Sequence, residues 1–167
     1  MQKKNITISI PDERQFKRHK NANKRKERAK EAIEVVLSIK KLHVSVKKDV
    51  LRRLLYAWTQ AEPQNPHATK FQSASAMSKI HARGSLVHEH VWTRKSVVEE
   101  LSNNATDTKA IGKILNRAIA CTITRDEDNA LRVSDNKFKH NKRHNGWTRY
   151  KKAGIDVYDV VTGKKKC

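Results

Sequence analysis

The apolar positions near the N-terminus change from strand-like to helix-like spacing. Ile6, Ile8 and Ile10 alternate with polar residues, which predicts a short strand that ends at Pro11. From there to about Leu42 the spacing is helical. The first half of this stretch is almost wholly polar. We therefore expect a long helix that is anchored by its second half, with a basic N-terminal half that reaches away from the body.

The next apolar positions predict a second helix, which Ser45 can cap. Its expected core face comprises Val46, Val50, Leu51, Leu54, Leu55 and Trp58. The stretch "EPQNPHAT" that follows contains two prolines and predicts a loop. A short helix from about Ser73 to Arg83 comes next, and Gly84 suits the position after its end.

The second half of the chain alternates short strands with capped helices. The run "LVHEHVW" predicts a strand, and Thr93 caps the helix after it. Another helix is expected from Asp107 to about Ile119, followed by a buried strand, "ACTIT". Thr124 and Glu127 have capping-box spacing, which predicts a helix start. A basic loop, a short helix "WTRYKKAG" and a last strand "IDVYDVV" complete the chain.

These elements predict an α+β fold that is mostly helical. A long basic N-terminal helix would precede a small body with short strands. We divide the chain into an N-terminal strand and helix (1–42), a body (43–131) and a basic C-terminal segment (132–167). No apolar run approaches the ~20 residues that span a bilayer, and no signal peptide is evident. Cys121 and Cys167 do not form a disulfide framework, so we expect a cytoplasmic protein.

The charge of the chain is strongly positive and unevenly distributed. Its 167 residues include 37 Lys and Arg against 17 Asp and Glu, for a formal net charge of +20. Residues 1–30 carry 11 basic and 3 acidic side chains, residues 132–152 carry 8 basic and 1 acidic, and residues 164–166 are all lysine. Patches of this kind are typical of proteins that bind a polyanion. A single short basic run would more often be a solvated helix face.

We expect the polyanion to be nucleic acid, with DNA favoured over RNA. A membrane surface is a weaker alternative, because the basic segments have few large apolar residues to insert. The cations expected to contact phosphates are Lys17, Arg18, Lys20, Lys24, Arg25, Lys26, Lys137, Lys139, Lys142, Arg143 and Arg149. Trp147 and Tyr150 could stack on a base, but their spacing favours inward packing.

Three ionisable residues, His88, Glu89 and His90, interrupt the apolar run of the predicted strand. In a regular strand the two histidines share one face and Glu89 lies on the other, so only a bulge or a strand end would direct all three to one ion. One alternative is that they hold a metal and move a proton. The other is that they are the outward positions of a surface strand.

"HEHVWTRKSVVEEL" and "ACTITRDEDNAL" resemble motifs of the HNH (ββα-metal) nuclease superfamily, and the similarity spans residues 86–131. The resemblance implies that Glu89 and Asp128 bind a divalent metal, Mg²⁺ or Mn²⁺ or else Zn²⁺. It also implies that His90 is the general base. His88 is a further candidate ligand, and Arg94 a candidate for gripping the phosphate. The chain departs from the family in having Thr93 where a proline is usual, and Asp128 where the helix carries a histidine.

The sequence thus supports two functions of different classes. The favoured one is an HNH-like metal-dependent endonuclease. The alternative is a non-catalytic DNA- or RNA-binding protein, such as a regulator, a packaging factor or an inhibitor from a mobile element or phage. In that case, Glu127 and Asp128 would simply be first-turn acids favoured by the helix dipole.

Overall fold

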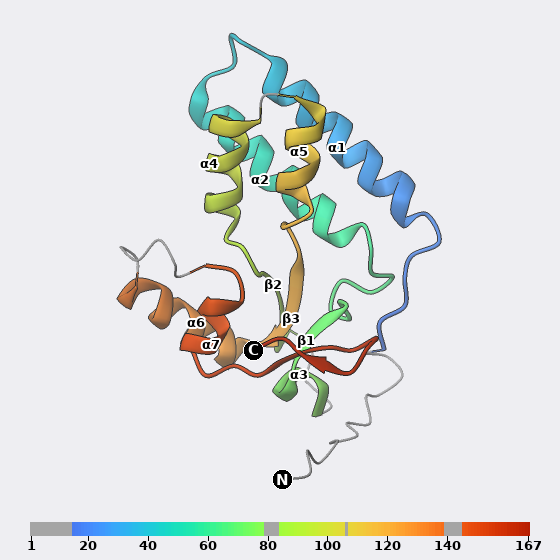
Figure 1. Ribbon diagram of the computed structural model, residues 1–167, viewed down its shortest axis with the longest axis vertical. Helices are drawn as coiled ribbons and strands as arrows, with labels where there is room; N and C mark the ends of the chain where they lie inside the picture. The colour runs from blue at the N-terminus through green and yellow to red at the C-terminus, as the bar shows by residue number, and fades with distance from the viewer. Residues whose placement is uncertain (1–14, 79–83, 106, 139–144) are drawn as a thin grey trace.

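The protein has an α+β fold in which helices predominate (Figure 1). The computed structural model describes residues 15–78, 84–105, 107–138 and 145–167. The strand predicted for residues 5–10 lies outside these ranges, as do the last five residues of the helix predicted for 73–83. In the part of the chain that the structure describes, no helix is long and apolar enough to cross a membrane.

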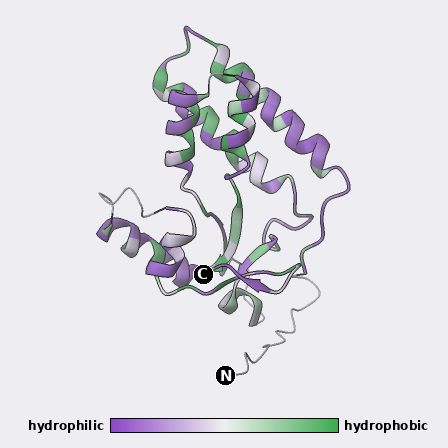
Figure 2. Cartoon of the chain, viewed as in Figure 1, coloured by the Kyte–Doolittle hydropathy of each residue, from purple (hydrophilic) through white to green (hydrophobic). Residues whose placement is uncertain are grey.

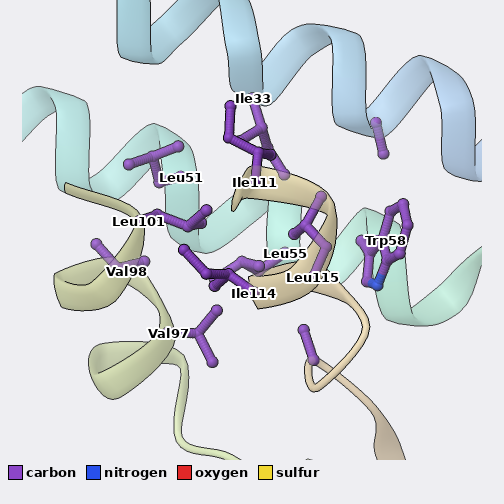
Figure 3. Packing of buried hydrophobic residues seen from close by; sticks show 12 residues of the cluster. Ile33, Leu51, Leu55, Trp58, Val97, Val98, Leu101, Ile111, Ile114 and Leu115 are labelled. Atoms are coloured by element: carbon purple, nitrogen blue, oxygen red, sulfur yellow. The ribbon is translucent and has the colours of Figure 1, made fainter. Parts of the chain in front are cut away.

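Four helices form one layer around the larger hydrophobic core. They are α1 (Ala22–Ser38), α2 (Val44–Gln60), α4 (Arg94–Asn104) and α5 (Thr108–Leu115). Figure 3 shows their apolar side chains pointing toward one another, with Trp58 at one side of the cluster. The fully or nearly fully buried members include Ile33, Leu51, Leu55, Val98, Leu101 and Leu115. Removal of these apolar side chains from water is the main contribution to the stability of this layer.

Helix α1 begins at Ala22, ten residues later than the predicted start after Pro11, so the expectation of one long basic helix was wrong at this end. The described residues before it are not helical. Arg18 pairs with Pro63 in an isolated β-bridge, and the His19 amide donates to the Glu62 carbonyl at 2.8 Å. The basic segment therefore lies along residues 62–64 and does not reach away from the body, because backbone pairing there replaces helical hydrogen bonds.

Helix α2 confirms most of the predicted core face. Leu51 and Leu55 are fully buried, and Trp58 is 9% exposed. Val46 is 47% exposed, so its assignment to the core was wrong. It lies in the first turn of α2, near the exposed end of the helix. The cap is His43, whose ring accepts from the Ser45 amide, and not Ser45 itself.

The sheet has five short strands in the order β2-β3-β1-β4-β5. They are β1 (Phe71–Ser73), β2 (Leu86–His90), β3 (Ala120–Thr124), β4 (Val157–Asp159) and β5 (Lys164–Lys165). Strands β1 and β3 are parallel, and the other neighbours are antiparallel. The sequence predicted β2, β3 and β4 but neither β1 nor β5, which are too short and too polar to show an alternating pattern.

Three further helices accompany the sheet: α3 (Ala74–Ser78), α6 (Arg125–Lys137) and α7 (Trp147–Lys152). The Thr124–Glu127 capping box at the start of α6 is confirmed. This helix continues into the stretch that was predicted as a basic loop. A second core lies between the sheet and the helices α6 and α7, and includes Cys121, Ile123, Leu131 and Tyr150. The ring centroids of Trp147 and Tyr150 are 5.5 Å apart, and both rings pack in the second core. This confirms their inward orientation.

Strands β2 and β3 form an antiparallel pair, and α6 packs against both. The helices α4 and α5 are inserted between the two strands and belong to the other layer (Figure 1). A strand–strand–helix unit is therefore present, with a helical hairpin in place of a short turn.

Replacing Leu55 with alanine should lower the free energy of unfolding by about 2–5 kcal/mol, because the lost side chain leaves a cavity in the larger core. Val46→Ala is the matched control in the same helix, and its effect should stay within about 0.5 kcal/mol, since Val46 is exposed. Urea unfolding followed by circular dichroism measures both. Equal losses in the two variants would contradict the assigned core.

Candidate functional site

Strand β2 directs its three ionisable residues to opposite faces of the sheet. The strand is regular, with His88, Glu89 and His90 opposite Thr122, Cys121 and Ala120 of β3. The two histidines are therefore on the face covered by α2, and Glu89 lies on the face covered by α6. Although β2 is at the edge of the sheet, His88 is only 8% exposed and His90 only 4%. The solvent-facing alternative was thus wrong for both histidines.

The two imidazoles share one hydroxyl of helix α2. Thr59 Oγ1 lies 3.1 Å from His88 Nε2 and 3.2 Å from His90 Nε2, while His88 Nδ1 lies 2.9 Å from the Pro66 carbonyl. A carbonyl only accepts, so His88 donates to Pro66 through Nδ1–H. The Thr59 hydroxyl donates to the Tyr56 carbonyl at 3.0 Å, so its single proton is already used. The Thr59 oxygen can in turn accept from His90 Nε2–H.

Burial keeps both rings neutral at pH 7. Desolvation lowers the pKa of His90 to about 3, and electrostatic repulsion from His88, in its protonated form, and from Arg94 acts in the same direction. Desolvation also lowers the pKa of His88, against a smaller opposing effect of its bond to Pro66. The Tyr56 ring lies against both imidazoles, with centroid distances of 5.3 and 6.1 Å. A neutral His90 suits a base chemically, but its Nε2 is occupied by Thr59 inside the protein.

Arg94 is the first residue of α4, where the Thr93 hydroxyl caps the helix by accepting from the Ser96 amide at 3.2 Å. The side chain is exposed, and its charge lowers the pKa of His88 and His90. Arg94 therefore belongs to the neighbourhood of the two histidines and is open to solvent. Of the residues predicted to act in catalysis, it is the accessible one.

The other face of β2 is organised by a guanidinium group. Arg149 Nη2 donates to Glu89 Oε1 at 3.1 Å and to Asp135 Oδ2 at 2.6 Å, and Nε donates to Asp135 Oδ1 at 2.9 Å. Its Nη1 donates to the His90 and Val91 carbonyls at 2.8 and 3.1 Å. Burial would lower the pKa of Arg149, but the hydrogen bonds and charge of Asp135, together with Glu89, raise it. The group is permanently charged.

Arg149 was predicted to contact nucleic acid, and the structure contradicts this assignment. The side chain is 3% exposed, and its donors are directed at carboxylates and carbonyls within the fold. A phosphate cannot reach it without displacing them. The sequence alone places this residue in a basic stretch and gives no sign of its partners.

The predicted metal ligands do not fit a bound ion. Glu89 pairs with Arg149, and Asp128 pairs with Arg132 at 2.9 Å. Burial raises the pKa of Glu89, Arg149 lowers it in part, and the charge of Asp128 acts in the same direction as burial. His88 and His90 are on the opposite face of β2 from Glu89. Among the described residues, no three His, Cys, Asp or Glu side chains are grouped so as to hold a metal.

Glu127, next to Asp128, has a structural role. Its carboxylate accepts from the Thr124 amide at 2.9 Å and from the Ser73 hydroxyl at 2.6 Å. The first contact completes the capping box, and the second joins α6 to the end of β1. The interpretation of Glu127 as a first-turn acid is therefore confirmed.

Most of the predicted phosphate contacts are accessible. Lys17, Arg18, Lys20, Lys24, Arg25 and Lys137 are exposed, and Lys26 is partly buried. Lys26 donates to Glu62 at 3.0 Å and lies 5.3 Å from the Trp58 ring centroid. Lys139, Lys142 and Arg143 lie outside the described residues.

A small cavity that the sequence did not reveal lies between residues 16–26, helix α2 and strands β1 and β3. We call it the arm pocket. Its volume is about 80 Å³. The residues that line it include Phe16, Lys26, Trp58, Glu62, Lys70, Phe71 and Asn116. No sequence signal connects these positions, because they come from five separate segments of the chain.

Comparison with models of protein families, with curated proteins and with solved structures found no match to this chain.

Replacing Arg149 with methionine should lower the free energy of unfolding by about 3–5 kcal/mol, because Glu89 and Asp135 lose their buried cation. Arg132→Met removes an ion pair whose arginine is 73% exposed, and should cost no more than about 1 kcal/mol. Chemical unfolding at pH 7 compares the two. The assigned role of Arg149 fails if both variants unfold at the same denaturant concentration.

The stability of the protein should fall as the pH drops from 7 to 5. The pKa of His90 is about 3 in the folded state and ~6.5 when unfolded, so the unfolded state binds more protons in this window. The contribution of His90 is about 2 kcal/mol at pH 5. Urea unfolding at both pH values should show a smaller loss for His90→Gln than for the native protein. An unchanged loss in His90→Gln would refute the assignment.

Proposed function

We propose that this protein binds nucleic acid through a basic surface around the arm pocket and does not depend on a metal at β2. One observation carries the proposal: cations that are far apart in the sequence gather at this place. Lys26 and Lys70 line the pocket, and Lys70 and Lys166 lie 5.7 and 5.6 Å from the same Phe71 ring centroid. The basic N-terminal segment and the lysine tail thus contribute to one surface.

The backbone of the basic segment, residues 15–21, is held by hydrogen bonds where it borders the arm pocket. The Gln64 amide donates to the Lys17 carbonyl at 2.8 Å, next to the Arg18–Pro63 bridge. Figure 2 shows hydrophilic residues along the N-terminal part of α1, which continues this surface. A fixed row of cations can neutralise successive phosphates and release their counterions, which favours binding.

Carboxylates offset only part of the charge of this surface. Glu62 accepts from Lys26 and lies 3.9 Å from Arg18, and Asp159 lies 3.6 Å from Lys70 and is 4% exposed. Meanwhile Lys17, Lys20, Lys24 and Arg25 remain exposed. The local excess of positive charge supports a polyanionic partner over an acidic patch of a folded protein, which would need a matched pattern of charges.

Catalysis at β2 receives less support. The strand–strand–helix unit is present, but its carboxylates are paired with arginines and its histidines face away from them. We therefore favour the non-catalytic alternative, a DNA- or RNA-binding protein. The pairing of the carboxylates with arginines and the separation of the histidines also disfavour the HNH-like endonuclease.

The combined change Lys17→Gln, Lys20→Gln and Lys24→Gln should weaken binding to a DNA duplex and reduce the slope of log K against log salt by up to about 2.7, since each phosphate contact contributes about 0.9. Lys95→Gln, Lys109→Gln and Lys113→Gln together remove the same charge from exposed positions on α4 and α5. That control should keep most of the native slope. Fluorescence anisotropy at several salt concentrations measures both. Equal effects of the two variants would show that only the net charge matters.

A plasmid assay tests the non-catalytic part of the proposal. The native protein should retard supercoiled plasmid and leave it uncut with Mg²⁺, Mn²⁺ or EDTA. Metal-dependent nicking that disappears in His90→Ala would overturn the proposal in favour of the nuclease.

A further inference from the structure

We propose that the arm pocket takes the edge of one unpaired nucleobase, so that the protein prefers single-stranded to double-stranded nucleic acid. The inference rests on the proposed function and adds the kind of substrate. It depends on the walls, the size and the polar groups of the arm pocket.

The walls of the arm pocket suit a planar ring. Phe16, Trp58 and Phe71 line it, and each belongs to a different segment of the chain. Phe16 comes from the basic segment, Trp58 from α2 and Phe71 from β1. Nucleobases stack on aromatic side chains with little dependence on base identity. A purely aliphatic ligand would not require the cations that surround these rings.

The size of the arm pocket limits what can enter. Its volume of about 80 Å³ is roughly half that of a cavity known to hold a benzene ring, about 150 Å³. The arm pocket is therefore too small to enclose a nucleotide or an element of another protein. It can receive the edge of a base whose sugar and phosphate stay outside, next to the lysines.

The polar groups of the arm pocket can bind both donors and acceptors on a base edge. Glu62 and Asn116 both line it. Carboxylates accept hydrogen bonds from amino and imino groups, whereas amides both donate and accept. Lys26 neutralises Glu62 at 3.0 Å, so the carboxylate does not repel the strand.

A base in a duplex is stacked and paired, so its edge cannot enter the arm pocket unless the nucleotide is first extruded. Single strands avoid this cost. Binding should therefore combine phosphate contacts, which both forms offer, with an insertion that only the single strand makes readily.

The test compares a 12-nucleotide oligothymidylate with a 12-base-pair duplex by fluorescence anisotropy. Phe16→Ala should weaken binding of the single strand about 5- to 100-fold, the range for loss of one stacked base. Its effect on the duplex should stay within twofold. Phe138→Ala is the matched control, because Phe138 is also partly buried beside lysines but lies away from the arm pocket. Thermal unfolding verifies that both variants fold.

A second pair of variants probes the polar side. Asn116→Asp adds a negative charge in the arm pocket, and Asn104→Asp adds the same charge at an exposed position at the end of α4. Only the first should selectively weaken binding of the single strand.

The inference is overturned if Phe16→Ala and Asn116→Asp bind the single strand as the native protein does. It is also overturned if both variants lose binding of the single strand and of the duplex equally. A native protein that binds duplex alone would also overturn it and leave the proposed function intact, whereas binding of neither form would refute the proposed function itself.

Competition with thymidine 5′-monophosphate distinguishes two sources of the base. Displacement of the oligothymidylate at micromolar monophosphate would show that the arm pocket accepts a free nucleotide. If the oligothymidylate stays bound at millimolar monophosphate and Phe16→Ala still weakens its binding, the arm pocket takes a nucleotide within a strand.

Discussion

The arrangement around β2 depends on the buried guanidinium of Arg149. It bonds to the carbonyls that end β2, to Glu89 on the same strand and to Asp135 on α6, while its own backbone belongs to α7. One side chain thus joins a strand and two helices that are distant in sequence. A buried charge is tolerated only when its donors are satisfied, and here carboxylates and carbonyls accept from all three guanidinium nitrogens.

This guanidinium also determines what the strand–strand–helix unit can do. A cation is already bound to the carboxylates on the α6 face, and it is covalently part of the chain. On the α2 face, two neutral histidines share the Thr59 hydroxyl. Each face of β2 is therefore complete in its own hydrogen bonds. Such a unit is suited to holding α6 and α7 against the sheet.

The sequence predicted the features that depend on near neighbours. The caps at Thr93 and Thr124 are confirmed, because each cap uses atoms within three residues. The alternation of His88, Glu89 and His90 was also sufficient to predict their separation onto two faces. The start of α1 was missed, because residues 15–21 pair with residues 62–64, and no local pattern encodes that contact.

The same limit applies to the site. Arg149 is indistinguishable in sequence from the surface cations around it, since its partners lie 14, 59 and 60 positions away. Strand β1 is likewise defined by β3 and β4 and not by its three residues. The arm pocket follows from these distant contacts and could not be predicted without them. The net charge could be predicted from the sequence, but the division of the charged side chains between interior and surface could not.

That division strengthens the case for a polyanionic partner. Asp128 and Asp159 are buried, and Glu89 is largely buried beside Arg149. Part of the acidic charge is therefore used inside the fold, whereas the lysines of the N-terminal segment and the tail remain exposed. The potential outside the protein is set chiefly by exposed charges, so the buried carboxylates offset the surface lysines less than exposed carboxylates would. Long-range attraction would bring a nucleic acid to the protein, and the arm pocket would then add a short-range contact that distinguishes one strand from two.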